Sequence, residues 1–454
     1  MINFEYETED KVILNPEDSD TPQMREMLSQ IDEEERARTS VEGLEINVVD
    51  AVCGAGKTSA AINMINNSDN GQKFMYITPY LDEVKRIIKS CPNKKFKQPE
   101  VYGSKLEDIK TLLRMGSNIV STHALFLKFD NEIMDLTQLQ GYILVLDEVV
   151  DVARQMDEIK GNDLHYLLEY TIQGDNGILK WNTDKTYDGD WLKKYKGYID
   201  LEALYYYDNK AILYLFPVKC FNAFREIYIL TYMFEAQVQR CYYDFNKLVY
   251  KYYHVNNNTP NEEGTQGYKF VEGKEPDSAI DQFSDLINIV KNVKMNDIGE
   301  KETALSVSWY NRNKGEGLMD SLRDNMINFF KHIAQTPSKQ NLWTTFDRNK
   351  KLLKGKGYTK SYLACNARAT NAYINRTAIA YMCNRYFNPV LKNFFIMQGV
   401  RVEEEAWALS ELLQFLFRSA IREGDKITVY IPSSRMKRLL ENWINKGPIY
   451  STDK

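Results

Sequence analysis

The sequence predicts an α/β protein in which parallel sheets are flanked by helices. From Glu45 to about Gln237, short apolar runs alternate with longer stretches of helical pattern, and this alternation is typical of a parallel sheet. A second series of the same kind follows after residue 290. Because 454 residues exceed the size of one hydrophobic core, we expect two domains with a binding site between them.

The elements of the first domain follow from its apolar runs. Five runs are expected as parallel strands: Ile46–Val49, Lys73–Ile77, Asn118–Ser121, Ile143–Leu146 and Glu226–Leu230. Residues 153–220 are polar and rich in Tyr and in turn signals, so we expect an insertion or small subdomain there. The polar stretch Asn256–Asp277 is expected to be a linker or surface loop.

The second domain is expected to repeat the pattern. We expect strands at Ala304–Trp309, Tyr362–Cys365 and Lys426–Ile431, and a helix at Leu409–Ile421. The predicted organisation has four parts: an acidic N-terminal extension at 1–45, a first domain at 46–240, a connecting segment at 241–289 and a second domain at 290–454.

Charge is distributed unevenly along the chain. The net charge is −5, yet residues 1–45 hold 14 acidic and 4 basic residues, whereas residues 336–400 hold 11 basic residues and one acid, Asp347. No run of eighteen apolar residues suggests a membrane span, and the N-terminus lacks the pattern of a signal peptide. The six cysteines form no Cys-x-x-Cys pair, which argues against a zinc site. Scattered cysteines of this kind favour reduced thiols and a cytoplasmic location.

The most informative segment is a glycine-rich loop between the first expected strand and a helical pattern. Backbone N–H groups in such a turn, together with the helix dipole, bind phosphate. We expect Lys57 to reach the β- and γ-phosphates of a nucleoside triphosphate and the Thr58 hydroxyl to bind Mg²⁺. A turn that merely joins a strand to a helix is the alternative. The expected phosphate cradle is Cys53, Gly54, Ala55, Gly56, Lys57, Thr58 and Ser59.

Two carboxylates, Asp147 and Glu148, end the fourth expected strand. Ligands of parallel sheets bind beyond the carboxyl ends of the strands. We therefore expect Asp147 to bind Mg²⁺ through water and Glu148 to polarise the attacking water. The alternative is an acidic strand end in solvent, but a phosphate loop about 90 residues earlier favours the catalytic interpretation.

A third signal lies in the C-terminal half, where Gln414, Arg418 and Arg422 recur at intervals of four in an apolar segment. On one helix they would form a single stripe. A buried arginine needs an anionic partner. A γ-phosphate bound to the other domain would be one, and an arginine there stabilises the charge of phosphoryl transfer. Pairing with Glu403–Glu405 is the alternative.

The basic stretch 336–400 interleaves cations with aromatic residues. Cations neutralise phosphates without reading sequence, and aromatic rings stack on unpaired bases, so we expect contact with nucleic acid. The alternative is a solvated loop whose aromatic residues serve the core. The tyrosine clusters at Tyr205–Tyr207 and Tyr242–Tyr243 are expected to pack in the core. The residues concerned in the basic stretch are Arg348, Lys350, Lys351, Lys354, Lys356 and Lys360, with Trp343, Phe346, Tyr358 and Tyr362.

These segments together resemble those of a superfamily 2 helicase or translocase of the DEAD/DEAH-like family and of the phage type. Ala51–Thr58 is similar to motif I, or Walker A, and Asp147–Val150 to motif II. Motif III keeps Thr231 but lacks the second hydroxyl of the family, and the arginines of motif VI are four apart where the family has three. Weaker similarities concern motif Ia at Ile77–Tyr80, the threonine segment at Val120–Ala124, motif III at Leu230–Met233, motif V at Ala364–Asn371 and motif VI at Gln414–Arg422.

The resemblance implies two RecA-like domains with ATP in the cleft between them, bridging Lys57 and either Arg418 or Arg422. It implies an ATP hydrolase that acts as a helicase or translocase on nucleic acid, with DNA favoured over RNA and with DNA replication or recombination proteins as partners. The implied contacts with the nucleic-acid backbone are Thr78, Thr122, Arg368 and Thr370. A packaging-type ATPase and a non-catalytic nucleic-acid-binding scaffold are the alternatives.

Overall fold

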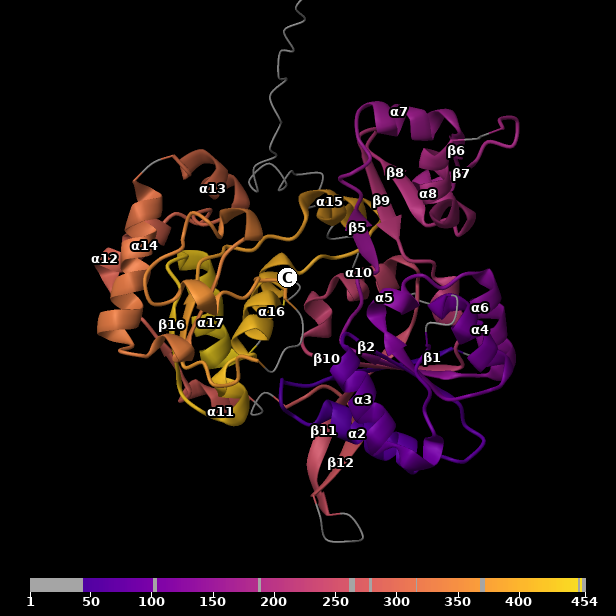
Figure 1. The fold of residues 1–454 in the computed structure, drawn as a ribbon, viewed down its shortest axis with the longest axis horizontal. Helices are drawn as coiled ribbons and strands as arrows, with labels where there is room; N and C mark the ends of the chain where they lie inside the picture. Colours follow the sequence, from indigo (N-terminus) through magenta and orange to yellow (C-terminus); the bar gives the residue numbers. More distant parts are fainter. Residues whose placement is uncertain are drawn as a thin grey trace, which may run out of the picture.

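The computed structural model describes residues 44–100, 104–186, 189–260, 266–276, 280–315, 317–367, 372–447 and 450. Two α/β domains lie side by side, each built on a largely parallel sheet flanked by helices (Figure 1). The predicted fold class is therefore confirmed. Most of the acidic extension lies outside the described residues.

The first domain contains a seven-stranded sheet in the order β12-β11-β1-β10-β4-β2-β3. Successive residues of its central strands are buried on opposite faces; Val48 and Val49, for example, belong to different core clusters. Burial on both faces explains why these strands read as continuous apolar runs. All five predicted strands are present, as β1 (Glu45–Asp50), β2 (Phe74–Thr78), β3 (Ile119–Thr122), β4 (Ile143–Asp147) and β10 (Glu226–Thr231).

The helices of this domain cover both faces of the sheet. They are α2 (Lys57–Asn66), α3 (Leu81–Ser90), α4 (Lys105–Arg114), α5 (His123–Phe126), α6 (Asn131–Gln140), α9 (Lys219–Asn222) and α10 (Val238–Phe245). Tyr242 and Tyr243 of α10 are buried, so this tyrosine cluster packs in the core as expected.

The linker expected at Asn256–Asp277 is wrong for most of its length. Strand β11 (Tyr250–Pro260) pairs in parallel with β1, and β12 (Gln266–Glu272) returns antiparallel to β11. The first sheet therefore continues well into the segment expected to connect the domains. The hairpin was missed because its Asn, Thr and Gly residues give a weak strand signal.

Residues 153–215 form a unit of their own at one end of the first domain (Figure 1). Its three-stranded sheet, β5-β9-β8, is antiparallel, unlike the parallel core of the main sheet. Its elements are β5 (Ala153–Gln155), α7 (Asn162–Glu169), β6 (Thr171–Gln173), β7 (Leu179–Trp181), α8 (Asp190–Asp200), β8 (Leu204–Tyr207) and β9 (Ala211–Leu215).

The second domain contains a four-stranded parallel sheet in the order β13-β16-β15-β14. Its strands are β13 (Ile287–Ile289), β14 (Asn341–Thr344), β15 (Ala378–Tyr381) and β16 (Ile427–Tyr430). Its main helices are α11 (Asp281–Ser284), α12 (Val293–Asn296), α13 (Val307–Asn313), α14 (Leu318–Asn328), α15 (Pro389–Met397), α16 (Glu404–Leu416) and α17 (Ser434–Lys446).

Two predicted strands of this domain are wrong and one is confirmed. Ala304–Trp309 runs into α13, because the Ser306 side chain accepts a hydrogen bond from the Trp309 N–H (3.2 Å) and caps the helix. Tyr362–Cys365 contributes only a single bridge, from Tyr362 to Trp343. The strand expected at Lys426–Ile431 is β16.

Helix α15 joins the two domains. It follows β15 in sequence, yet Leu391, Phe394 and Phe395 belong to the core cluster of the first domain. The Phe394 ring lies 5.5 Å from that of Tyr207 and 5.4 Å from that of Phe245 (centroid distances). Figure 1 shows α15 beside β5 and β9. Within the described part of the chain, no helix is both long and apolar enough to span a membrane.

Candidate nucleotide site

The phosphate loop has the backbone that its glycines predict. Gly54 and Gly56 have φ angles of +88° and +90°, which side-chain-bearing residues rarely adopt. A Cβ at Gly56 would also lie 2.3 Å from ring carbons of Tyr268 on β12. Helix α2 then begins at Lys57, so Thr58 and Ser59 are in its first turn, where backbone N–H groups have no partner within the helix.

The Lys57 side chain folds back onto the loop. Its Nζ donates hydrogen bonds to the carbonyl oxygens of Ala51 (2.5 Å) and Val52 (3.0 Å). No acidic residue occupies the first turn of α2, so nothing in that turn competes with an anion for the helix N-terminus. The loop is therefore arranged to receive phosphate groups, with an ammonium group beside it.

Two carboxylates that the sequence analysis did not assign to the site support this loop. The Asp50 carboxylate accepts hydrogen bonds from the N–H groups of Met233 (2.7 Å) and Phe234 (2.8 Å), which ties the loop to the end of β10. Glu275 accepts one from the Val52 N–H (2.8 Å). Burial raises the pKa of Asp50, and burial raises that of Glu275 to about 7. A carboxylate at the end of β1 was visible in the sequence, but Glu275 lies more than 200 residues from its partner.

Asp147 lies at the carboxyl end of β4, between β10 and β2. Burial raises the pKa of Asp147 to about 7, and the neighbouring Glu148 charge adds to this rise. The Tyr76 hydroxyl donates to Asp147 Oδ2 (3.3 Å), and His123 Nε2 lies 2.8 Å from the Asp147 carbonyl oxygen. A buried carboxyl group of this kind is a good ligand for a divalent cation, because the cation replaces the lost hydration.

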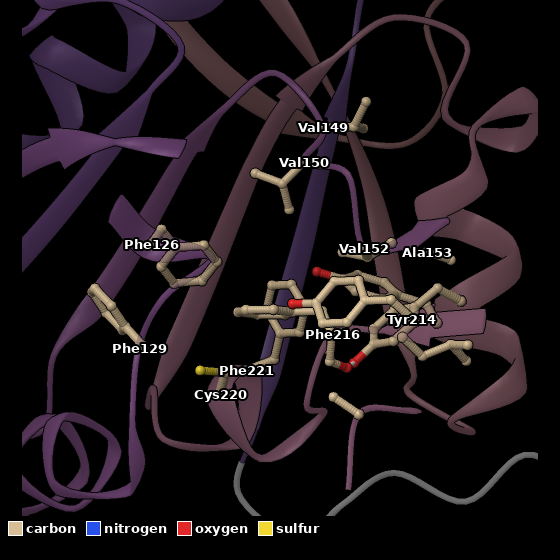
Figure 2. Close-up of a cluster of buried hydrophobic side chains, with 14 of the residues drawn as sticks. Phe126, Phe129, Val149, Val150, Val152, Ala153, Tyr214, Phe216, Cys220 and Phe221 are labelled. Carbon is tan, nitrogen blue, oxygen red and sulfur yellow. Dashed lines mark hydrogen bonds between the residues drawn. The ribbon is translucent and has the colours of Figure 1, made fainter. Parts of the chain in front are cut away.

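Glu148 adopts a strained backbone conformation. Its φ is +65°, and this positive angle turns the chain away from the β4 direction. Its N–H still donates to the Leu230 carbonyl oxygen (3.0 Å). The residues that follow anchor this turn, because Val149, Val150 and Val152 are buried in the hydrophobic cluster that also contains Phe126, Tyr214 and Phe216 (Figure 2). The Val150 N–H also donates to the Gln239 side chain (2.9 Å).

The predicted arginine helix is partly wrong. Helix α16 ends at Leu416, and Arg418 and Arg422 lie beyond it, so Gln414, Arg418 and Arg422 form no continuous helical stripe. Arg418 Nε donates to the Gln414 carbonyl oxygen (2.8 Å), as at a helix end. Arg422 lies in a short 3₁₀ turn, Ala420–Glu423, and is exposed.

Arg418 faces the first domain. Its side chain is buried, at 6% exposure for the residue, and its Nη1 has no hydrogen-bond partner among the residues that the structure describes. Burial lowers the pKa of Arg418, and the opposing charges include those of Glu148 and Cys53 in the first domain. Burial also raises the pKa of Cys53, and the positive charges of Arg422 and Arg418 partly oppose this rise. A buried guanidinium near the phosphate loop whose Nη1 has no hydrogen-bond partner among the described residues is suited to an incoming anion.

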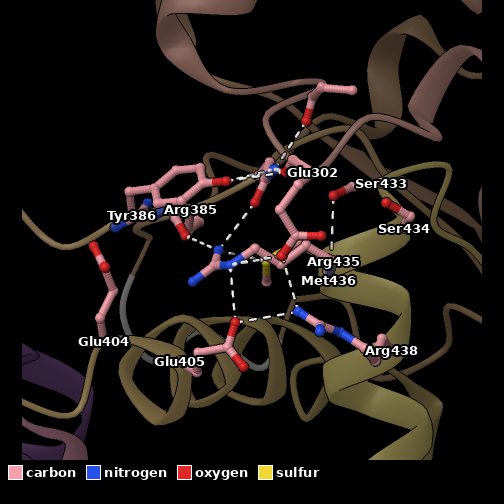
Figure 3. Close-up of polar contacts among 12 residues, drawn as sticks. Glu302, Arg385, Tyr386, Glu404, Glu405, Ser433, Ser434, Arg435, Met436 and Arg438 are labelled. Atoms are coloured by element: carbon pink, nitrogen blue, oxygen red, sulfur yellow. Dashed lines mark hydrogen bonds and ion pairs between the residues drawn. The ribbon is translucent and has the colours of Figure 1, made fainter. Parts of the chain in front are cut away.

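The alternative pairing with Glu403–Glu405 is not what the structure shows for Arg418. These glutamates pair with other cations: Glu403 with Arg401 (2.8 Å), Glu404 with Lys392 (2.8 Å) and Glu405 with Arg435 (3.3 Å). Arg435 also donates to Asn384 and to the Arg385 carbonyl oxygen, and Arg438 joins through Glu302 and Glu405 (Figure 3). This network fixes the start of α16 and thereby the chain that carries Arg418.

The segment that resembles motif III lacks the family's second hydroxyl, and this segment contacts the second domain through other side chains. Trp443 Nε1 of α17 donates to the Tyr232 hydroxyl (2.8 Å). The Gln237 amide donates to Ser410 Oγ of α16 (3.3 Å). Both contacts join the end of β10 to helices of the opposite domain.

The expected nucleic-acid contacts have mixed outcomes. Thr78 is fully buried, so its side chain does not reach a surface ligand in this conformation, whereas Thr122 is only half-buried and precedes α5. Arg368 and Thr370 lie outside the described residues. In the basic stretch, Trp343 and Tyr358 are buried, at 0% and 1% exposure, so the expectation that they stack on bases is wrong. The cations exposed around them are Arg348, Lys351, Lys354, Lys356 and Lys360.

The molecule is therefore a two-domain α/β protein in which a glycine-rich loop and the carboxylates at the end of β4 belong to the first domain, and Arg418 of the second domain faces them. The chain belongs to the YonV family. It is 36% identical over 415 residues to the SPbeta prophage-derived protein YonV of Bacillus subtilis (strain 168), a match covering 88% of this chain and 98% of that protein. Residues 281–444 match the YonV C-terminal Rossmann-like domain.

Solved structures with some similarity are helicases. S. tokodaii Xpd4 matches with a TM-score of 0.43 at 12% identity, over 94% of this chain and 97% of that one. An XPD helicase matches with a TM-score of 0.36 at 11% identity, over 92% and 97%. The DUF1998 helicase MrfA bound to DNA and AMPPNP matches with a TM-score of 0.33 at 11% identity, over 94% of this chain and 51% of that one. At these TM-scores, the function has to be inferred from the site residues.

Proposed function

We propose that this protein is a Mg²⁺-dependent ATPase stimulated by nucleic acid and acts as a helicase or translocase. The observation that supports this proposal best is the position of Arg418. This arginine of the second domain is buried near the charges of Glu148 and Cys53 of the first, and its Nη1 has no hydrogen-bond partner within the described part of the chain. Such an arginine stabilises the charge that develops on a transferring phosphoryl group.

Each site residue has a role in this reaction. The loop Cys53–Ser59 binds the phosphates, and Lys57 leaves the carbonyl oxygens of Ala51 and Val52 to reach the γ-phosphate. Thr58 and Asp147 hold Mg²⁺, which neutralises phosphate charge when bound. Glu148 orients the attacking water, and Arg418 rather than the exposed Arg422 acts as the arginine finger.

The contacts from Tyr232 and Gln237 to the second domain link the site to domain movement. Hydrolysis removes the γ-phosphate that joins Arg418 to Lys57, so the closed arrangement loses one of its links. The exposed cations that follow β14 would then bind nucleic-acid phosphates with little sequence preference and strong salt dependence. We favour DNA as the nucleic acid, a cytoplasmic location, and replication or recombination proteins as partners.

The test is ATP hydrolysis measured with and without single-stranded DNA at low salt. We expect DNA to stimulate hydrolysis, and Lys57→Ala to abolish hydrolysis while DNA binding persists. Lys85→Ala, at an exposed lysine on α3 (75% side-chain exposure), is the matched control and should behave as wild type. DNA binding without any hydrolysis would instead identify a non-catalytic scaffold, and hydrolysis indifferent to DNA and RNA would contradict the translocase.

A further inference from the structure

A cavity of about 480 Å³ lies beside the phosphate loop. The loop contributes Val52–Ala55 to its wall, and the strand next to β1 contributes His254. Among the described residues, neither Lys57 nor Asp147 lines it. Strand β11 pairs with β1 on one side, whereas β10 and then β4, which carries Asp147, follow on the other. The cavity therefore lies across the loop from the expected metal ligands.

This position is where the nucleoside part of a bound nucleotide would extend. A triphosphate has its γ-phosphate toward the metal and the arginine, so its α-phosphate and ribose leave the loop on the opposite side. The volume lies within the range of ligand pockets, roughly 300–1,000 Å³. Both domains contribute to the cavity, since Ile421 and Arg422 complete its wall.

The cavity combines apolar surface with a few polar groups, as a base site requires. Phe283 and Leu286, which begin the second domain, give it an apolar wall together with Ile421. The polar side chains in its wall are those of His254, Asn256, Glu275, Gln282 and Arg422. The His254 ring is oriented by the Gly273 carbonyl oxygen, 3.2 Å from Nδ1.

Glu275 is the residue that connects cavity and loop. One of its carboxylate oxygens accepts the Val52 N–H (2.8 Å), and the carboxylate has further acceptor capacity on its other oxygen. Above its pKa of about 7, Glu275 is a carboxylate, which accepts hydrogen bonds and does not donate them. In this form it favours a base with an amino group over one with a carbonyl group at the same position. A glutamine amide both donates and accepts, and it matches the amino group and ring nitrogen of adenine.

We propose that this cavity binds the adenine and ribose of ATP, and that Glu275 selects adenine by accepting a hydrogen bond from its exocyclic amino group. Gln282 reads the same edge of the base, and Phe283 supplies apolar contact. The proposal rests on the proposed ATPase function and adds its base specificity. Loop, hairpin and second domain then enclose one nucleotide from three sides.

The experiment compares the affinities of ATP, ITP and inorganic tripolyphosphate for the full chain in the presence of Mg²⁺, by titration calorimetry at pH 8, above the pKa of Glu275. ITP differs from ATP in having a carbonyl group in place of the amino group, and tripolyphosphate has no base. We expect wild type to bind ATP about tenfold more tightly than ITP, the value of one hydrogen bond to a charged acceptor. Glu275→Gln, whose amide can also donate, should bind both nucleotides within about threefold of each other.

Gln282→Ala is the second variant, and it should weaken ATP binding about tenfold while leaving tripolyphosphate binding unchanged. The matched controls are Glu272→Gln and Gln138→Ala, at exposed residues outside the cavity. An unchanged preference for ATP over ITP in Glu275→Gln, or no preference in wild type, would overturn the base site while the ATPase stands. If wild type binds neither ATP nor tripolyphosphate, the proposed function fails as well.

Discussion

Replacing Asp147 by Asn should make the metal-free protein more stable at neutral pH while abolishing ATP hydrolysis. Asp147 is confined between β10 and β2, and burial together with Glu148 raises its pKa from 3.8 to about 7. The folded protein therefore binds a proton on this carboxyl group more tightly than the unfolded chain does. Asn has nearly the same shape and no charge, so it removes the cost of ionising the group inside the fold.

The size of the effect follows from linkage between folding and protonation. A difference of one pKa unit is worth about 1.4 kcal/mol, so the rise to about 7 corresponds to at most about 4 kcal/mol of lost stability above pH 7. Below pH 4 the carboxyl group is protonated in both states and the cost disappears. The stability advantage of Asp147→Asn should therefore grow as pH rises from 4 to 7, by roughly 2–4 kcal/mol, and then stay constant.

Urea denaturation in EDTA at pH 5 and pH 8 measures this advantage as a difference in unfolding free energy. Asp135→Asn, at an exposed aspartate on α6, is the control and should change stability by less than about 0.5 kcal/mol at both values. Saturating Mg²⁺ and ATP should reverse the order, because only the carboxylate binds the metal. An advantage that is absent, or equal at both pH values, would refute the view that Asp147 is held at a desolvated cation site.

Two further substitutions test the loop and the arginine. Gly56→Ala should lower the free energy of unfolding by about 2 kcal/mol because of the positive φ and the nearby Tyr268 ring. In a Tyr268→Ala background the same substitution should cost about half as much. Strictly additive costs in this double-mutant cycle would contradict the contact between the two residues. Arg418→Ala should reduce the rate of ATP hydrolysis about a thousandfold without lowering stability, and Arg422→Ala much less; equal losses in the two variants, measured as kcat, would contradict the assignment of the finger to Arg418.

The sequence predicted best what depends on neighbours in the chain. The strands β1, β2, β3, β4 and β10 of the first sheet were predicted because they are buried on both faces and read as continuous apolar runs. The glycines of the loop were informative because positive φ angles at Gly54 and Gly56 demand this residue type. Local pattern misled at Ala304–Trp309, since an apolar run with a capping Ser306 begins a helix instead of a strand.

Contacts between distant segments left no pattern to detect. Glu275 and Tyr268 support the phosphate loop from a hairpin that reads as a polar linker. The end of α16 was misplaced because apolar residues continue past Leu416 into the segment of Arg418. Whether Trp343 stacks on a base or fills a core depends on the sheet around it, which the stretch 336–400 does not encode by itself.

Helix α15 has a mechanical consequence. Its residues Leu391, Phe394 and Phe395 complete the hydrophobic core of the first domain, and Asn388, at its start, donates to Gln155 (3.2 Å). The two domains are thus held together by apolar packing at this end. Helix α11 lies at the other end (Figure 1), and its Phe283 lines the cavity beside the phosphate loop. We therefore expect relative motion of the two domains to pivot about α15, so that a small rotation there gives a larger displacement at the nucleotide end. Separating α15 from the first domain would expose apolar surface, so we expect the domains to rotate relative to each other without dissociating.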